Sequence, residues 1–170
     1  MKYQFLTLPQ YSQQCRFEME WLRDDIGFWD LWIGKGDFDT QYLHQVFQDR
    51  DNEILLLFIS PELQKRQGTT IITDLAGVVA HSHFCLDGEN YCVILLMAKR
   101  YGLPIKRVGY SLIQELGRRL LQTHDTVTFL CVDDSQIPDY YGKLGFTLTT
   151  DEKYQQLLDY PEKKIYYRNF

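Results

Sequence analysis

The chain has 170 residues, 45% of them hydrophobic and 15% aromatic, which is enough for one domain with a buried core. Its net charge of −5 and pI of about 5.3 argue against nucleic acid as a partner, because nucleic-acid-binding surfaces are basic. No apolar run reaches the length of a membrane span, and the first residues lack the pattern of a signal peptide. We therefore expect one cytoplasmic domain over residues 1–170, with no membrane partner.

The first third of the chain predicts two strands with two helices between them. Residues 2–8 alternate apolar and polar side chains until Pro9, as a strand does. Ser12 and Asp39 are residue types that cap helices, and Tyr42, Val46 and Phe47 would share one face of the second helix. The expected elements are a strand over 2–8, a helix over 12–23, a loop or short turn over 27–34, a helix after Asp39, a strand over 53–59 and a loop over 61–68.

The rest of the chain predicts a long hairpin, a strong helix and a final pair of strands. The hairpin is expected because Asp87-Gly88-Glu89-Asn90 is a strong turn sequence between apolar runs. The helix over 108–122 is the clearest element, since leucines and an isoleucine recur at helical spacing. The expected elements are strands over 75–86 and 91–98, the helix over 108–122, a strand over 127–132, a short helix over 138–144, and antiparallel strands over 147–150 and 164–169.

The predicted order of elements is β-α-α-β-β-β-α-β-α-β-β. Hairpins combined with a single β-α-β crossover indicate an α/β fold, with a mixed, mostly antiparallel sheet flanked by helices. Four scattered cysteines without a CxxC pair are expected to be thiols rather than a disulfide framework.

The most informative segment is Tyr140-Tyr141-Gly142-Lys143-Leu144-Gly145-Phe146, which follows a short apolar strand. It resembles the Y-x-K-x-G-F signature of the GNAT superfamily, the acyl-CoA-dependent N-acyltransferases, whose element order the chain also resembles. In that resemblance Tyr141 matches the general acid of the family. Tyr140 is its neighbour on a helix, points elsewhere and is assigned to packing. A purely structural interpretation is an aromatic helix end packed into a core.

A second segment resembles the pyrophosphate motif of the same family, R/Q-x-x-G-x-G/A, over residues 103–113. If Gly109 is the first motif glycine, Lys106 replaces R/Q and Ser111 replaces G/A. If Gly109 is the second glycine, Arg107 replaces the first and Pro104 stands at R/Q. The helix register favours the second placement. Either way one glycine remains, and Lys106 and Arg107 could supply charge to the phosphates.

The resemblance implies acetyl-CoA as cosubstrate and a set of residues around it. Strand residues would run beside the pantetheine arm, and the start of the following helix would bind the pyrophosphate. Asp134 stands where many family members carry an asparagine, although it could equally cap a helix. The implied cofactor-binding residues are Leu96, Met97, Ala98, Lys106, Arg107, Val108, Gly109, Tyr110, Ser111 and Asp134.

The implied reaction is transfer of an acetyl group to a primary amine by direct attack. Tyr141 would protonate the leaving thiolate, and a backbone N–H of Met97 or Ala98 would polarise the carbonyl. The strand over 91–98 has no carboxylate, so the base would act through water or lie on another element. The candidates for that base are His81, His83, Asp133 and Glu89.

The acceptor is expected to be a small amine or a protein amine. Aromatic and acidic residues in the first helix and the following loop suit a cation. The competing interpretation of the same residues is an apolar surface for a second copy of the chain, and hence a homodimer. These residues are Trp21, Asp24, Asp25, Phe28, Trp29, Asp30 and Trp32.

The sequence also fits two other functions. The loss of a motif glycine also fits a catalytically degenerate acyl-CoA-binding or protein-binding module on the same fold. His81, His83 and Cys85 share one face of a strand and could bind zinc. No fourth ligand with metal-site spacing follows, so no metal site is predicted, and partly buried histidines with satisfied hydrogen bonds are the default.

Overall fold

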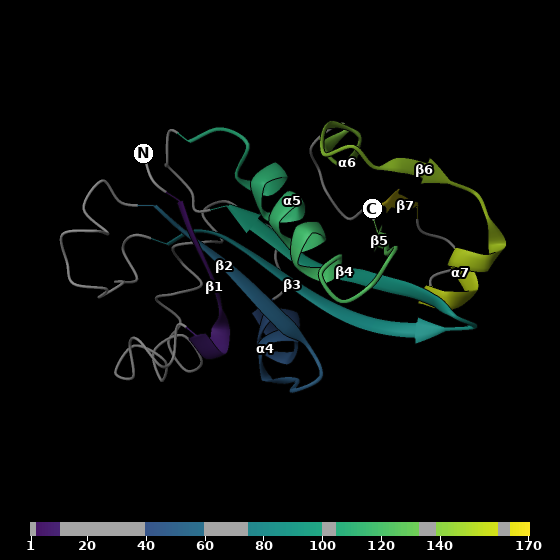
Figure 1. The fold of residues 1–170 in the computed structure, drawn as a ribbon, viewed down its shortest axis with the longest axis horizontal. Helices are drawn as coiled ribbons and strands as arrows, with labels where there is room; N and C mark the ends of the chain where they lie inside the picture. The colour runs from purple at the N-terminus through teal and green to yellow at the C-terminus, as the bar shows by residue number, and fades with distance from the viewer. Residues whose placement is uncertain (1–2, 11–39, 60–74, 100–104, 133–138, 160–163) are drawn as a thin grey trace.

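A computed structural model describes residues 3–10, 40–59, 75–99, 105–132, 139–159 and 164–170 (Figure 1). They form a sheet in the order β1-β2-β3-β4-β5-β7-β6. Only β4 and β5 run parallel, so the expected mixed and mostly antiparallel sheet is confirmed. The strands are β1 (Tyr3–Thr7), β2 (Glu53–Ile59), β3 (Leu75–Leu86), β4 (Glu89–Lys99), β5 (Thr128–Val132), β6 (Thr147–Thr149) and β7 (Ile165–Asn169).

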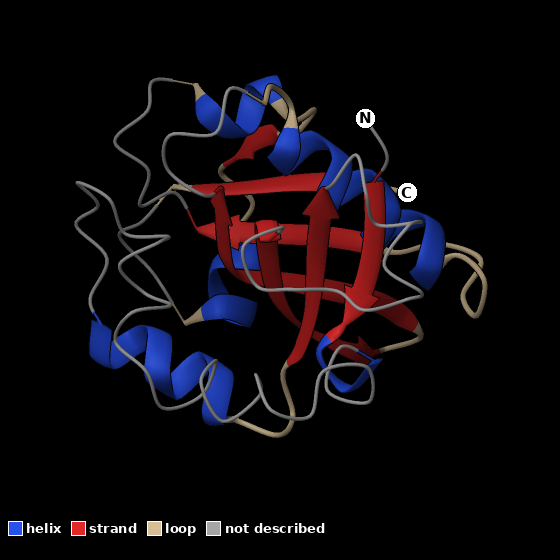
Figure 2. Ribbon diagram, turned by 90° about the vertical axis from the view of Figure 1, so that its left-hand side faces the viewer, coloured by secondary structure: helices blue, strands red, loops and turns tan. Residues whose placement is uncertain are grey.

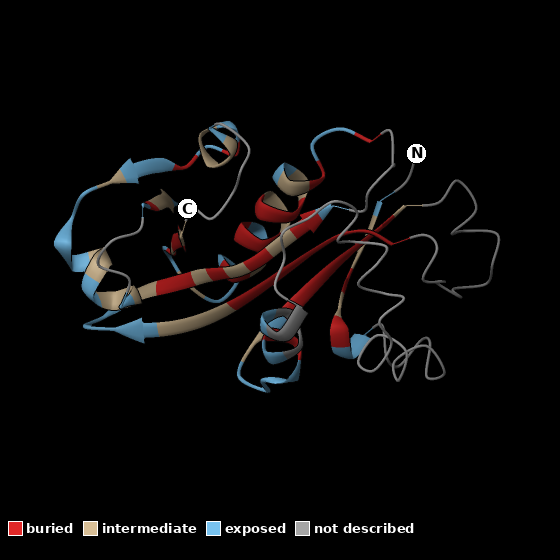
Figure 3. Ribbon diagram, turned by 180° about the vertical axis from the view of Figure 1, so that it is seen from behind, coloured by how far each residue is buried: buried red, intermediate tan, exposed pale blue. Residues whose placement is uncertain are grey.

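Helices cover both faces of this sheet (Figures 1 and 2). Helix α5 (Val108–Leu120) packs on β2, β3 and β4 through its buried stripe, which includes Leu112 and Leu116. Helix α4 (Thr40–Gln48) places Val46 and Phe47 in a second apolar cluster on the opposite face. The central strands are therefore buried on both sides (Figure 3), and β2 reads as a continuous apolar run.

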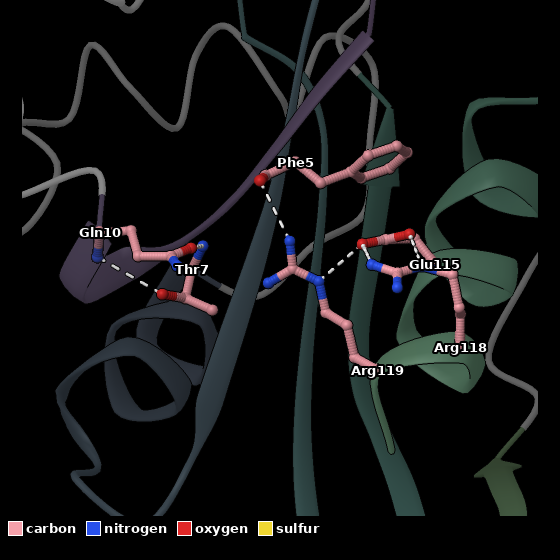
Figure 4. A network of polar contacts seen from close by, with 6 residues as sticks. All are labelled: Phe5, Thr7, Gln10, Glu115, Arg118 and Arg119. Atoms are coloured by element: carbon pink, nitrogen blue, oxygen red, sulfur yellow. Dashed lines mark hydrogen bonds and ion pairs between the residues drawn. The ribbon is translucent and has the colours of Figure 1, made fainter. Parts of the chain in front are cut away.

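Polar contacts fasten α5 to the edge of the sheet (Figure 4). Glu115 accepts hydrogen bonds from Arg118 Nε at 2.8 Å and from Arg119 Nε at 2.7 Å. Arg119 Nη2 also donates to the carbonyl oxygen of Phe5 in β1 at 3.1 Å. These bonds lower the pKa of the Glu115 carboxyl, Arg118 contributing most. The orientation of α5 is thus set by charge as well as by its apolar stripe.

The β3–β4 hairpin turns at the predicted place. Asp87 (φ 52°) and Gly88 (φ 81°) both have positive φ, as the tight turn between twisted strands requires. Near this turn Glu89 accepts hydrogen bonds from Tyr91 and from Lys153 of helix α7 (Glu152–Leu158). The hairpin is therefore held against a segment from the end of the chain.

Helix α7 is an element that the sequence analysis missed, because it expected β6 and β7 as a simple pair. Its first turn is capped locally, because the Asp151 carboxylate accepts from Lys153 N at 2.9 Å. Tyr154 then stacks on Tyr167 of β7 with ring centroids 5.7 Å apart. A short helix that packs through aromatic rings carries little of the long apolar periodicity by which helices are recognised.

The remaining expectations are met within small shifts at element ends. Helix α6 (Tyr140–Lys143) is shorter than the predicted range of 138–144, of which residue 138 is not described. The elements expected at 12–23, 27–34 and 61–68 lie outside the described residues. In the described part of the chain, none of the helices has the length and apolarity to span a bilayer.

Candidate active site

The central feature of the site is a strand edge on β4 that β5 leaves open. The two strands pair only from Tyr91 opposite Thr128 to Ile94 opposite Cys131. β4 nevertheless continues to Lys99 and stays paired with β3 on its other side. Residues 95–99, called the open edge here, therefore lack a strand partner on the β5 side within the described ranges. Apart from the Leu95 carbonyl, the backbone groups of residues 95–99 that face away from β3 are available to a ligand that carries amides.

A β-bulge begins the open edge. Ala80 pairs with Leu96 and His81 with Ile94, so Leu95 is the extra residue. The Tyr42 hydroxyl, from α4, donates to the Leu95 carbonyl oxygen at 2.7 Å. The bulge places both Leu95 and Leu96 against the apolar cluster on the α4 side. It thereby bends β4 at the point where pairing with β5 ends.

The start of α5 has the backbone of an anion-binding site. Arg107 lies immediately before the helix in the left-handed conformation (φ 63°, ψ 23°) and makes no side-chain cap bond. The first bond of the helix turn runs from Ser111 N to the Arg107 carbonyl oxygen at 2.9 Å. The N–H groups ahead of Ser111 therefore point out of the helix end, where the helix dipole also favours negative charge.

The conformation of Arg107 favours one of the two possible alignments with the pyrophosphate motif. A left-handed residue favours glycine and costs a larger residue about 1 kcal/mol. Position 107 is a motif glycine only in the second placement, in which Gly109 is the other glycine. The geometry therefore supports the second placement. An arginine thus occupies a backbone conformation that suits glycine.

The predicted cofactor residues fall into two groups around this region. Leu96 and Ala98 turn their side chains into the α4-side cluster, whereas Met97 packs on the α5 side. At the helix start Lys106, Arg107 and Tyr110 are exposed, Ser111 and Gly109 are half-buried, and Val108 is buried in the α5-side cluster. Val108 could therefore reach a ligand only through its backbone. Asp134 lies outside the described residues.

Helix α6 holds its two tyrosines in different ways. The ring of Tyr141 packs against Phe146 (centroids 5.9 Å apart) and against Tyr166 of β7 (5.5 Å apart). Its carbonyl oxygen accepts from the backbone N–H groups of Leu144 and Phe146, both at 3.0 Å. Tyr141 is thus fixed at the helix end by aromatic contacts and by the turn that follows.

Tyr140 packs against the α5-side cluster, as the sequence analysis expected, and its hydroxyl also points toward the start of α5. A Cβ atom added at Gly109 would lie 2.8 Å from the Tyr140 hydroxyl oxygen and 3.4 Å from Met97 Sδ. The hydroxyl therefore lies between the helix start and the open edge. Burial raises the pKa of this phenol, with a further contribution from Cys131. The sequence does not reveal where the Tyr140 side chain points, because Tyr140 and Tyr141 are identical neighbours on one short helix.

Arg168 of β7 holds α6 in place. Its Nη1 donates to the Leu144 carbonyl oxygen at 2.5 Å, and its guanidinium lies 4.4 Å from the centre of the Phe170 ring. The Gln114 amide oxygen, in the orientation that the neighbouring donors require, accepts from Arg168 Nη2 at 2.5 Å. Gly145 (φ 85°) makes the turn beneath this guanidinium. One side chain therefore links α5, α6 and β7.

His83 lies at the other end of α5 from the open edge. His83 packs on His124, which follows the helix C-terminus, with ring centroids 4.5 Å apart. Because an α-helix rises about 1.5 Å per residue, this end is roughly 20 Å from Gly109. Burial lowers the pKa of His81 to about 4, with a smaller effect from His83. His83 therefore lies far from the start of α5, whereas His81 pairs with Ile94, one residue before the open edge, where its lowered pKa makes it a weak base.

The structure also bears on metal binding and on the remaining candidates for the base. Across the described residues, no three or more side chains of His, Cys, Asp or Glu gather closely enough to hold a metal ion. The Lys153 and Tyr91 hydrogen bonds lower the pKa of the Glu89 carboxyl, which makes it a weaker base. Asp133 lies outside the described residues.

A surface hollow on α7 contains no predicted site residue; it is lined by Glu152, Gln155, Gln156 and Asp159.

Comparison with known proteins identifies the fold. No family model matches the chain, and no curated protein sequence matches it. Among solved structures, Tetrahymena GCN5 matches with a TM-score of 0.64 and 13% identity, over 99% of this chain and 96% of that chain. KacTA, solved in a complex with DNA, matches with a TM-score of 0.60 and 14% identity, over 99% and 93%.

A third match is the N-acetylglutamate synthase of Neisseria gonorrhoeae, solved with coenzyme A and N-acetyl-glutamate. Its TM-score is 0.54 at 9% identity, over 99% of this chain and 35% of that chain. The chain likewise spans 17% of a fungal multi-domain β-N-acetylglucosaminidase with a GCN5-related glucosamine N-acetyltransferase region. The chain therefore has the fold of the GCN5-related N-acetyltransferases, as its sequence resemblance implied.

Proposed function

We propose that the chain is an N-acetyltransferase that moves an acetyl group from acetyl-CoA to a primary amine. The observation that carries this proposal is the open edge of β4, which lies beside the uncapped start of α5. A strand edge with free amides suits the pantetheine arm, and a helix N-terminus suits phosphates. Acetyl-CoA carries the pantetheine arm and the phosphates side by side on one molecule, as the open edge and the start of α5 lie side by side in the chain.

In this proposal the phosphates bind at the start of α5. The N–H groups of residues 108–110 point toward them, and the exposed Lys106 and Arg107 add positive charge. Ser111 stands at the end of the first turn and can donate through its hydroxyl. The arm runs along Leu96, Met97 and Ala98 through main-chain contacts. Asp134 is proposed to contact the same arm.

The proposed chemistry is direct transfer. The neutral amine nitrogen attacks the thioester carbonyl carbon, and a carbon–nitrogen bond forms as the carbon–sulfur bond breaks. Tyr141 protonates the departing thiolate, and its phenolate regains a proton through solvent as the amine nitrogen loses its surplus proton. A backbone N–H of Met97 or Ala98 stabilises the oxyanion. The rings of Phe146 and Tyr166 pack on Tyr141 and fix its ring in one orientation, which supports its role as the acid.

The acceptor is proposed to be a small amine or a protein amine, and a second copy of the chain remains a proposed partner. The acidic net charge favours a cationic acceptor over an anionic one. The aromatic and acidic residues between positions 21 and 32, expected to line the acceptor site or a dimer interface, lie outside the described residues.

A second candidate function is an acyl-CoA-binding module without catalysis. The observation that favours it is Arg107, which fills a position whose backbone conformation suits glycine. A side chain there keeps a phosphate further from the backbone than glycine would. The two candidates share the binding step and differ only in whether thiol is released.

The test is release of free CoA thiol from acetyl-CoA over a panel of small amines and amine-bearing peptides. Because general acids contribute roughly 10²–10⁴-fold, Tyr141→Phe should lower kcat about 100-fold with little change in the KM for acetyl-CoA. Tyr3→Phe, at an exposed position on β1, is the matched control and should keep full activity. Undiminished turnover in Tyr141→Phe would remove this tyrosine from the reaction. Binding without thiol release for every amine would favour the module.

A further inference from the structure

The hydroxyl of Tyr140 is the polar side-chain group that lies where the pantetheine arm is proposed to pass. It stands within 2.8 Å of the point that a Cβ atom at Gly109 would occupy, and Met97 Sδ lies 3.4 Å from the same point. Gly109 belongs to the start of α5 and Met97 to the open edge. The hydroxyl thus lies at the junction of the phosphate site and the strand edge.

This hydroxyl makes no hydrogen bond with any residue that the structure describes. Its ring is held from the side, edge-on to Tyr141 with centroids 5.3 Å apart, and it packs against the α5-side cluster. The hydroxyl is not among the fully buried polar atoms that lack a partner, so its oxygen keeps contact with solvent. Its donor is therefore available to a ligand. Because burial raises its pKa, the phenol stays protonated at neutral pH.

We propose that Tyr140 contacts the cosubstrate and donates its hydroxyl hydrogen to an amide carbonyl of the pantetheine arm, an inference that rests on the proposed function. The arm carries amide groups, and it would lie between the backbone of the open edge and this phenol. Gly109 makes room for the contact, since a side chain there would occupy the space of the hydroxyl. Tyr140 then binds the arm, and Tyr141 protonates the thiolate.

The experiment is calorimetric titration of the full chain and of Tyr140→Phe with two ligands. One ligand is acetyl-CoA, and the other is adenosine 3′-phosphate 5′-diphosphate, the nucleotide part of the cosubstrate, which has no arm. A neutral hydrogen bond corresponds to a change of roughly three- to tenfold in Kd. We expect Tyr140→Phe to weaken acetyl-CoA by that factor and to bind the nucleotide as the wild type does. Tyr141→Phe, on the same helix, should bind both ligands normally.

Different results would contradict the Tyr140 contact and the proposed function. Equal affinity of wild type and Tyr140→Phe for acetyl-CoA overturns the contact, and so does an equal loss for both ligands, which would indicate general damage to the site. Tighter acetyl-CoA binding by Tyr140→Ala would mean that the ring merely fills the path of the arm. A wild-type chain that binds neither ligand refutes the proposed function itself, which separates that failure from failure of the Tyr140 contact.

Discussion

Burial of His81 makes the stability of this fold sensitive to mild acid. His81 is 2% exposed and lies on β3. Its Nδ1 has no hydrogen-bond partner in the described structure, and its Nε2 is 3.7 Å from the largely exposed Glu53 carboxylate. The nearby titratable groups are His83, Glu53 and Cys92. The Glu53 contact is too long and too solvated to offset burial, so the pKa of His81 falls from 6.5 to about 4.

The direction of the pH effect follows from this shift. As the pH falls below 6.5 the unfolded chain binds a proton at His81, whereas the folded chain does not until about pH 4. The stabilising contribution is therefore complete above pH 6.5 and is lost as the pH falls toward 4. Linkage gives a loss of about 2 kcal/mol in the free energy of unfolding between pH 7 and pH 5.

Urea unfolding at pH 7 and pH 5 measures this loss. The wild type should lose about 2 kcal/mol more than His81→Gln between the two pH values, because the variant has no proton to bind. His83→Gln is the matched control on the same strand; its side chain is more exposed, so it should remove a smaller part of the pH dependence. The same pH dependence in wild type and His81→Gln would refute the reasoning.

Two further predictions concern packing around α5 and α6. Arg168→Lys keeps the charge but loses the forked contacts that hold α6, so kcat should fall about tenfold while the Kd for acetyl-CoA changes less than about twofold. Steady-state kinetics would measure kcat and calorimetry would measure Kd. An unchanged kcat in Arg168→Lys would show that Arg168 has no positioning role. Gly117→Ala would place a Cβ atom 2.6 Å from the Phe170 ring, so thermal unfolding should show a stability loss of about 1 kcal/mol despite the better helix propensity of alanine. An unchanged Tm would mean that the ring moves aside freely.

Much of the fold was predictable because its signals are local. The apolar run of β2, the Asp87-Gly88 turn and the periodic stripe of α5 each specify an element within a few residues. Helix α7 was missed because its packing depends on distant partners, Glu89 on the hairpin and Tyr167 on β7. Tertiary contacts decide whether such a short helix forms.

The site was predictable as a region but not in its details. The segment containing Tyr141 located α6, and the motif around Gly109 located the start of α5. The extent of the open edge depends on where β5 stops pairing, which no sequence pattern in β4 reports. Likewise, the direction of Tyr140 depends on how α6 packs against β7. The left-handed conformation of Arg107 was hidden because an arginine gives no sign of it.

Calorimetric titration of the wild-type chain with acetyl-CoA tests the central claim most directly. The account predicts saturable one-to-one binding that weakens at least about tenfold in Lys106→Ala/Arg107→Ala, which lacks both cations at the start of α5. Arg118→Ala removes an exposed cation from the opposite end of the same helix and should bind as the wild type does. Absence of binding at millimolar acetyl-CoA, or full affinity in the double variant, would contradict the claim that this helix start binds the phosphates.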